Sequence, residues 1–397
     1  MANPRKVVIM GLGGGAGKVM SSIAQKHAGS WAKLLQFDTD VEALRDVEGV
    51  QAVTIGEECN DGQGCGGNLQ LGATAAASSV RQFNAEIRGA DLLLVVVCLG
   101  GGTGSGGVET LARLAREEGI TTFFFVTLPM AAEGNRARQA ADSAITHLHR
   151  STAIVAAVPS DLLFSQVPPG TKASTAFSIA NDVLADGIVG MAELSRCRGM
   201  LAVDFAHLKS LLANRNAICS FGVGRATGEL RENQVVANLF ESPMLGGKTF
   251  MAGADVVVVT LLAGDDLSIG ELNGCLKTLH AALPQKVETV VGANESDGMS
   301  ETLQLTMLVI SYQRQEEAAT TTAAITTRVV KKTEPVKKRT HVLPTEPYDD
   351  GTRTRQMRLP FAEEKHRLGI FGATQPTLYN EQNLDIPTFR RLGISLD

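Results

Sequence analysis

A run of glycines directly after a strongly apolar segment constrains this sequence more than any other feature. Residues 92–97 read Leu-Leu-Leu-Val-Val-Val, and residues 98–107 read Cys-Leu-Gly-Gly-Gly-Thr-Gly-Ser-Gly-Gly. A short, continuous apolar run of this kind is typical of a strand buried on both faces of a sheet. The next segment has few side chains, so its backbone N–H groups can converge on an anion, and its two hydroxyls add donors. We therefore predict a phosphate-binding loop.

The segment after this loop supports the same interpretation. Residues 108–119 carry apolar side chains at helical spacing. The positive N-terminal end of such a helix also favours phosphate. The alternative is a flexible linker, but linkers are not normally placed between a buried strand and a periodic helix.

Composition limits the class of protein. A chain of 397 residues that is 44% hydrophobic is long enough for two domains and appendages. Residues 1–310 carry 31 acidic and 23 basic side chains, whereas residues 311–397 carry 11 and 14. An acidic body argues against nucleic acid as the main partner. The six cysteines form no metal-ligand spacing, and no segment approaches the ~20 apolar residues of a membrane span, so we expect a cytoplasmic protein without a bound metal at the cysteines.

Apolar runs alternate with helical patterns along most of the chain. This alternation predicts an α/β fold with a mostly parallel sheet covered on both sides. The expected strands are 7–10, 33–37, 53–56, 92–97, 121–128, 154–158, 217–222, 254–262, 286–293 and 303–310, and the expected helices include 19–27, 108–119 and 177–194.

A second glycine-rich loop, Gly11–Lys18, follows the first expected strand. Its pattern fits the G-x-G-x-x-A of a Rossmann dinucleotide site, with Asp38 about twenty residues further on. It does not fit a P-loop, because Leu12 and Val19 stand where that loop needs Gly and Ser or Thr. Two phosphate loops on one sheet suit a nucleoside triphosphate better than a dinucleotide, although the Rossmann oxidoreductase remains an alternative.

The sequence Gly-Gly-Gly-Thr-Gly-Ser-Gly resembles the signature loop of the tubulin/FtsZ superfamily of polymerising GTPases. Further similarity to FtsZ follows in the expected order along the chain. The matching segments are 11–17, the Asp-Thr-Asp of 38–40, 62–72, 129–134, 176–184 and the C-terminal peptide Leu384–Arg391. Tubulin lacks such a peptide, so the combination favours FtsZ.

The resemblance implies that GTP or GDP is bound, together with Mg²⁺. The residues that would bind the nucleotide are Gly13, Gly14, Gly15, Gly17, Lys18, Asp40, Gly66, Gly67, Asn68, Gly100, Gly101, Gly102, Thr103, Gly104, Ser105, Gly106, Glu133, Arg136, Phe177 and Asn181. Phe177 and Asn181 would meet the guanine base, which suits an aromatic ring and an amide that both donates and accepts.

The catalytic loop departs from the family. FtsZ places two acids and an Asn on a loop that reaches the next subunit's nucleotide, and here Asp204 keeps the first acid while His207 replaces the second and Ala202 replaces the Asn. Asp204 and His207 are the expected catalytic residues. Neutral His207 could accept a hydrogen bond from water, whereas the protonated ring could not. Three positions expected at the nucleotide-binding site also differ from the family, namely Lys18, Ala137 and Ser160.

The resemblance completes the expected organisation: a Rossmann-like GTP-binding domain over 1–175, a central connecting helix over 176–199, and a second, smaller α/β domain with the catalytic loop over 200–312. A disordered linker over 313–380 and a partner-docking peptide over 381–397 follow. The implied function is a GTPase of the division ring that assembles head to tail and binds a membrane-tethering division protein through Leu384–Arg391, with no membrane span of its own. A nucleotide-dependent polymer with little hydrolysis is a further alternative.

Overall fold

The computed structural model describes residues 5–26, 30–151, 154–165, 167–195, 200–212, 217–246, 251–296 and 298–312, with residues 378–379 and 382–383. Contacts divide the chain into two units, residues 1–331 and 332–397. In the second unit, β11 (Leu378–Tyr379) pairs with β12 (Gln382–Asn383) in an antiparallel ladder. The predicted linker and the docking peptide Leu384–Arg391 otherwise lie outside the described residues.

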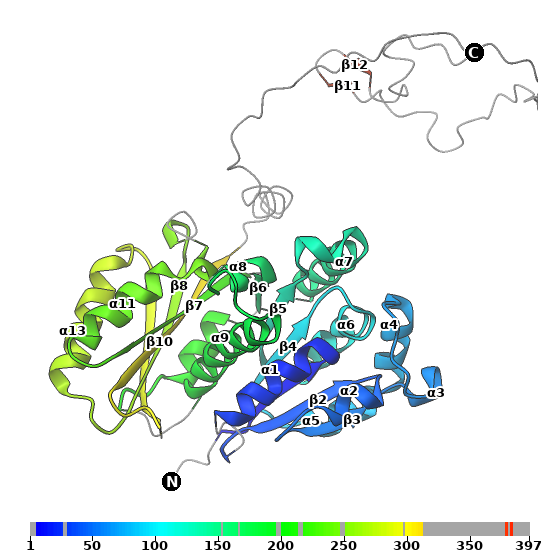
Figure 1. The fold of residues 1–397 in the computed structure, drawn as a ribbon, viewed down its shortest axis with the longest axis horizontal. Helices are drawn as coiled ribbons and strands as arrows, with labels where there is room; N and C mark the ends of the chain where they lie inside the picture. Colours follow the sequence, from blue (N-terminus) through cyan, green and yellow to red (C-terminus); the bar gives the residue numbers. More distant parts are fainter. Residues whose placement is uncertain are drawn as a thin grey trace, which may run out of the picture. The chain divides into compact units, whose positions relative to one another are not determined.

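Ten strands of the first unit form one continuous sheet in the order β3-β2-β1-β4-β5-β6-β7-β10-β8-β9 (Figure 1). Only β10 runs antiparallel to its neighbours, β7 and β8. The other neighbouring pairs are parallel. The strands are β1 (Val7–Leu12), β2 (Lys33–Asp38), β3 (Gln51–Thr54), β4 (Leu92–Cys98), β5 (Thr121–Leu128), β6 (Ile154–Pro159), β7 (Ala217–Thr227), β8 (Val256–Ala263), β9 (Glu288–Glu295) and β10 (Thr302–Tyr312).

Helices cover both faces of the sheet. They are α1 (Gly14–Gln25), α2 (Val41–Arg45), α3 (Glu57–Asn60), α4 (Leu69–Ser78), α5 (Val80–Ile87), α6 (Gly102–Glu117), α7 (Asn135–Arg150), α8 (Ser160–Phe164), α9 (Ala173–Glu193), α10 (Phe205–Leu212), α11 (Arg231–Glu241) and α13 (Ile269–Ala282), with short 3-10 turns η2 (Ala131–Glu133) and η3 (Pro243–Leu245). Figure 1 shows α1 and α9 side by side, and the two helices are in contact.

The apolar strands are buried on both faces because successive side chains point in opposite directions. Val8 and Ile9, for example, are both fully buried but belong to different hydrophobic clusters. One cluster lies under α1 and α9 and extends across the sheet from β2 to β9. The second lies under α5, α6 and α7, and the third under α11 and α13. The helix α9 therefore packs on both halves of the sheet, which otherwise meet where β6 pairs with β7 over three residues.

The structure confirms the predicted α/β class with a mostly parallel sheet, and each predicted strand has a counterpart. The prediction over 217–222 was too short, because β7 continues through Gly222 and Gly224 to Thr227. Both glycines are required by close packing rather than by a turn. A Cβ on Gly222 would lie 2.5 Å from the Leu245 side chain, and one on Gly224 would lie 2.3 Å from the carbonyl oxygen of Val235.

Helix starts were also predicted too late, at residues 19 and 108. Both helices begin inside the glycine-rich segments, α1 at Gly14 and α6 at Gly102. Glycine has a low intrinsic helix propensity, so sequence patterns assign such segments to loops. Close packing overrides that preference here. A Cβ on Gly106 would lie 2.3 Å from the carbonyl oxygen of Leu69, and one on Gly72 only 2.1 Å from that of Gly102, so the glycines allow α4 and α6 to touch.

Candidate functional site

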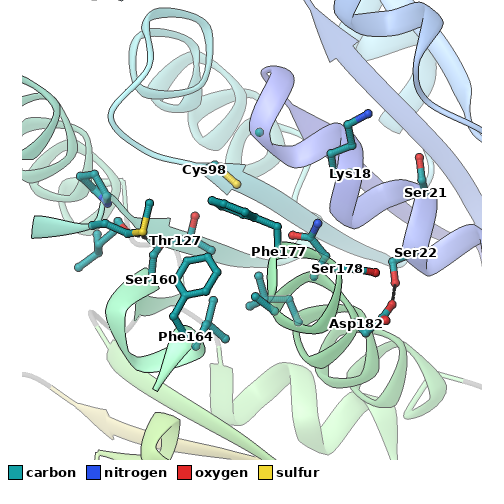
Figure 2. Close-up of a pocket in the computed structure, with 18 of the residues that line it drawn as sticks. Lys18, Ser21, Ser22, Cys98, Thr127, Ser160, Phe164, Phe177, Ser178 and Asp182 are labelled. Carbon is teal, nitrogen blue, oxygen red and sulfur yellow. Dashed lines mark hydrogen bonds between the residues drawn. The ribbon is translucent and has the colours of Figure 1, made fainter. Parts of the chain in front are cut away.

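A cavity of about 590 Å³ opens beside the carboxyl ends of β4 and β5 and between α1 and α9 (Figure 2). Ligands of open parallel sheets bind at this edge, outside the carboxyl ends of the strands. Five of the residues predicted to bind nucleotide line the cavity, namely Gly15, Lys18, Glu133, Phe177 and Asn181.

The predicted base-binding residues lie one turn apart on α9. Phe177 is 49% exposed, which is unusual for a phenylalanine, and its ring makes an edge-to-face contact with Phe164 at 4.8 Å between centroids. Figure 2 shows the Phe177 ring between Cys98 and Phe164. An exposed ring held by a second ring offers a flat apolar surface for stacking, which suits a nucleobase.

Glycine is required where α1 approaches the end of β4. A Cβ on Gly15 would lie 2.6 Å from the Cβ of Cys98, closer than real side chains approach. Burial raises the pKa of the Cys98 thiol, so this sulfur contributes an uncharged lining to the cavity. The first turn of α1 thereby reaches the cavity wall.

The predicted phosphate-binding segments converge beside the cavity. A Cβ on Gly13 would lie 3.1 Å from the backbone nitrogen of Gly104, so segments 11–17 and 100–107 are adjacent. The hydroxyls of Thr39 and Thr103 are hydrogen-bonded at 2.7 Å. Arg136 donates from Nη2 to the carbonyl oxygen of Gly67 at 3.2 Å. Four segments that are distant in the sequence are thus brought together.

The glycine-rich segment contributes two different surfaces. Gly100 and Gly101 precede α6, and nothing lies within 4 Å of a Cβ placed on Gly101. The N-terminal N–H groups of α6 have no side-chain cap, so they are available to an anion. The Ser105 hydroxyl accepts a hydrogen bond from the Gly100 nitrogen at 2.8 Å. Gly102, Gly104 and Gly106 pack against neighbouring backbone or side chains.

Other predicted residues have structural roles. Asp40 caps α2 by accepting bonds from the backbone nitrogens of Glu42 and Ala43, and Asn68 caps α4 in the same way. Gly14 lies against Asp38, Gly17 against Val47, and nothing lies within 4 Å of a Cβ on Gly66.

Asp38, on which the dinucleotide alternative depended, is only 2% exposed. Its Oδ1 accepts bonds from the backbone nitrogens of Thr39 at 2.7 Å and Asp40 at 3.3 Å. Burial raises the pKa of this carboxyl. A Rossmann acid needs an accessible carboxylate for the ribose hydroxyls, so this geometry disfavours the oxidoreductase alternative.

Sequence reasoning missed a contact between α1 and α9 in the cavity wall. Ser22 donates from its hydroxyl to Asp182, and Figure 2 shows this bond joining the two helices. The partners are 160 residues apart, so no local pattern could have indicated the pair.

Ser160 lines the cavity and donates to the carbonyl oxygen of Leu128 at 2.6 Å. Ala137, another departure from the family pattern, lies against Gly100.

The predicted catalytic residues lie far from the cavity. Phe177 is near the start of α9, whereas the segment before α10 packs at its end, where a Cβ on Gly292 would lie 3.0 Å from both Leu194 and Val203. The helix has 21 residues and a length of about 30 Å. The cavity is lined by α9 residues from Ser174 to Leu184, whereas the segment that carries Asp204 packs at the other end of the helix.

The loop that carries Asp204 is firmly held. Val203, Phe205 and Leu208 are buried, whereas Asp204 and His207 are exposed. Asp204 caps α10 through Oδ1, which accepts from the backbone nitrogens of Ala206 at 2.9 Å and His207 at 3.4 Å. Three buried apolar anchors therefore fix a surface on which two polar side chains project.

Comparisons with known proteins identify the family. A family model for the tubulin/FtsZ GTPase domain matches residues 6–167, and a model for the FtsZ C-terminal domain matches residues 217–313. The cell division protein FtsZ of Buchnera aphidicola subsp. Schizaphis graminum is 29% identical over 308 residues, which cover 78% of this chain and 79% of that protein. That of Buchnera aphidicola subsp. Acyrthosiphon pisum is 28% identical with the same coverage.

Comparison with solved structures indicates the same family. An empty FtsZ dimer from M. jannaschii superposes with a TM-score of 0.71 at 26% identity, covering 79% of this chain and 89% of that one. CetZ2 from Haloferax volcanii, a GTPγS-bound protofilament, has the same fold at 22% identity and a TM-score of 0.63, covering 82% and 98%. The chain therefore belongs to the tubulin/FtsZ family and combines its GTPase domain with an FtsZ-type C-terminal domain.

Proposed function

We propose that this protein is a polymerising GTPase of the cell-division ring, in which one subunit binds GTP and the next supplies the catalytic loop. One observation carries the proposal. Phe177, which lines the candidate nucleotide cavity, and the segment that carries the exposed Asp204 lie near opposite ends of α9, a helix of 21 residues that is about 30 Å long. Head-to-tail stacking of subunits would bring the two ends together. The name of one structural relative describes a dimer and that of another a protofilament, which supports such stacking.

In this proposal the chain binds GTP with the segments around Gly13, Thr39, Gly67 and Gly101, while Phe177 stacks on the base. The N-terminal N–H groups of α1 and α6 stabilise the phosphates. In a head-to-tail stack, the Asp204 carboxylate accepts a hydrogen bond from the attacking water and orients it toward the γ-phosphate of the neighbouring subunit.

Mg²⁺ is proposed to accompany the triphosphate. Within the described residues, no three His, Cys, Asp or Glu side chains form a metal cage. That fits Mg²⁺ at a nucleotide, which is held mainly by phosphates and water with one or two protein oxygens. Asp40 would provide such an oxygen, since its Oδ1 caps α2 and leaves Oδ2 for the metal. When bound, the ion would neutralise charge that develops on the phosphates.

The test measures GTP turnover against protein concentration, with light scattering in parallel. We expect turnover per subunit to rise with concentration as polymer forms, and GTP to bind in preference to ATP and NAD(H). Turnover that is independent of concentration would refute the shared site. Binding of NAD(H) without guanine nucleotide would favour the oxidoreductase alternative instead.

A second candidate is a GTP-dependent polymer with little hydrolysis. It is favoured by His207 and Ala202, which replace two polar residues of the family's catalytic loop. Normal assembly with GTP but negligible phosphate release would support this alternative.

We further propose a cytoplasmic location at the division site and a membrane-tethering partner for Leu384–Arg391. Among the described helices, none is both long and apolar enough to cross a bilayer. Ile386, Pro387 and Phe389 form a short apolar sequence followed by two arginines. A linker of 68 residues would span about 40–50 Å if flexible, so the peptide could reach a partner while the body remains in a filament.

A further inference from the structure

Beside the loop that carries Asp204, the side chain of His207 contacts a carboxylate from a distant part of the sequence. His207 Nε2 lies 3.0 Å from Glu288 Oε1, and the two side chains are 50% and 48% exposed. Glu288 is the first residue of β9 and lies 81 positions further along the sequence, so nothing in the loop itself predicts the contact. The pair is solvent-accessible on the same surface as Asp204.

The strand β9 holds this loop at two points. Leu201 and Ala293 exchange backbone hydrogen bonds at 3.1 Å, and the Glu288–His207 contact lies five residues earlier on the same strand. Five residues of a strand span about 17 Å. Asp204, which lies between Leu201 and His207, is thereby presented from a segment fixed at both ends.

The contact indicates which nitrogen of the ring carries the hydrogen. An ionised carboxylate oxygen has no hydrogen to donate, so its 3.0 Å approach to Nε2 favours the tautomer with the hydrogen on Nε2. In a neutral imidazole the other nitrogen, Nδ1, is then an acceptor. Two carboxylates touch His207, since Glu288 contacts the ring and Asp204 contacts the backbone N–H. A neutral ring in this state can accept a hydrogen bond from water, as a carboxylate would.

We propose that Glu288 is a positioning residue for GTP hydrolysis: it fixes His207 so that Nδ1 accepts a hydrogen bond from the attacking water at the neighbouring subunit's nucleotide. This inference rests on the proposed function. The water oxygen bonds to the γ-phosphorus, the bond from that phosphorus to the β–γ bridging oxygen breaks, and the water's proton leaves with the phosphate, so that GTP and water give GDP and phosphate. The His207–Glu288 pair replaces the second acid of the family's loop.

The experiment uses the full chain and compares three single variants with wild type: Glu288→Ala, Glu288→Gln and His207→Asp. Asp204 is kept in all of them. Glu295→Ala is the matched control, because it removes the same charge from the other end of β9. Phosphate release is divided by the amount of sedimented polymer. We expect about tenfold lower turnover per polymerised subunit for Glu288→Ala, as when a functional histidine loses its hydrogen-bond partner. Glu288→Gln, which keeps an acceptor oxygen, should lose less, and Glu295→Ala should resemble wild type.

A double variant separates positioning from a merely structural role. In the His207→Asp background, Glu288→Ala should not lower turnover further, because the residue through which Glu288 acts is gone.

Three outcomes would overturn the inference: unchanged turnover in Glu288→Ala, an equal loss in the His207→Asp background, or a loss that only follows the loss of polymer. The last would make the pair an assembly contact. Failure of the proposed function is distinguishable, because turnover would then be independent of both concentration and Asp204.

Discussion

Substitutions at Asp204 separate the helix-capping role of this carboxylate from its proposed catalytic role. Asp204 caps α10 and also projects from the surface proposed to meet the next nucleotide. Asn is as good an N-cap as Asp, whereas Ala is not. Asp204→Asn therefore removes the charge and keeps the cap, and Asp204→Ala removes both.

The expected magnitudes differ for stability and for catalysis. Loss of the cap in Asp204→Ala should lower the free energy of unfolding by about 1 kcal/mol. In a unit of this size, that corresponds to a fall in Tm of about 2 °C. Asp204→Asn should leave Tm within error of wild type. Both variants should lose about 100-fold or more in GTP turnover, the usual loss when a group that orients a reacting water is removed.

The assay combines thermal unfolding, GTP binding and phosphate release on the same preparations. Nucleotide affinity should stay within a few-fold of wild type in both variants, because Asp204 does not line its own subunit's cavity and its segment packs at the far end of α9. If Asp204→Asn kept wild-type turnover while Asp204→Ala lost it, Asp204 would act as a helix cap and the proposed shared site would be wrong.

Three further predictions concern other parts of the chain. Gly106→Ala should destabilise the fold by about 1–3 kcal/mol, because its Cβ would lie 2.3 Å from a backbone oxygen of α4. A Cβ at position 101 meets open space, so Gly101→Ala should keep the Tm of wild type but weaken GTP binding. Equal Tm values for the two variants would refute the packing role of Gly106. Arg231 lowers the pKa of Glu271 to about 2, so this ion pair should stabilise the fold fully above about pH 4.5 and lose its contribution as the pH falls toward 2; Glu271→Gln should flatten that part of an acid unfolding curve, and an unchanged curve would contradict it. Deletion of residues 381–397 should leave GTP binding and assembly nearly unchanged but disperse the protein from division sites, and loss of assembly would place this segment in the folded body.

The sheet could be predicted well because its strands are buried on both faces. The sequence of such a strand is a continuous apolar run, for which Leu92–Val97 is the clearest example. The prediction failed where a glycine has a packing role. Gly222 and Gly224 lie within β7, and Gly102 begins α6, although glycine is disfavoured in the interiors of both strands and helices. The neighbours that require those glycines, such as Leu245 and the backbone of α11, are distant in the sequence.

The candidate site could be predicted only as separate segments. Residues such as Gly15 and Phe177 were found because they lie in recognisable local patterns, and both line the cavity. The hydrogen bonds from Ser22 to Asp182 and between Thr39 and Thr103 join partners 160 and 64 residues apart. Pairs of this kind depend on how helices pack, which a single sequence does not encode in any short window.

The packing of α9 links this geometry to assembly. One hydrophobic cluster includes residues of α1, α9 and strands from both halves of the sheet, so α9 is fixed against the GTP-binding half and the C-terminal half alike. Protein interiors are close-packed, so moving Asp204 from the end of α9 to the cavity would require this core to be broken. A subunit therefore cannot bring its own Asp204 to its own cavity by a small rearrangement. If the protein hydrolyses GTP with Asp204, the reacting nucleotide must belong to another subunit, and hydrolysis should appear only as subunits assemble.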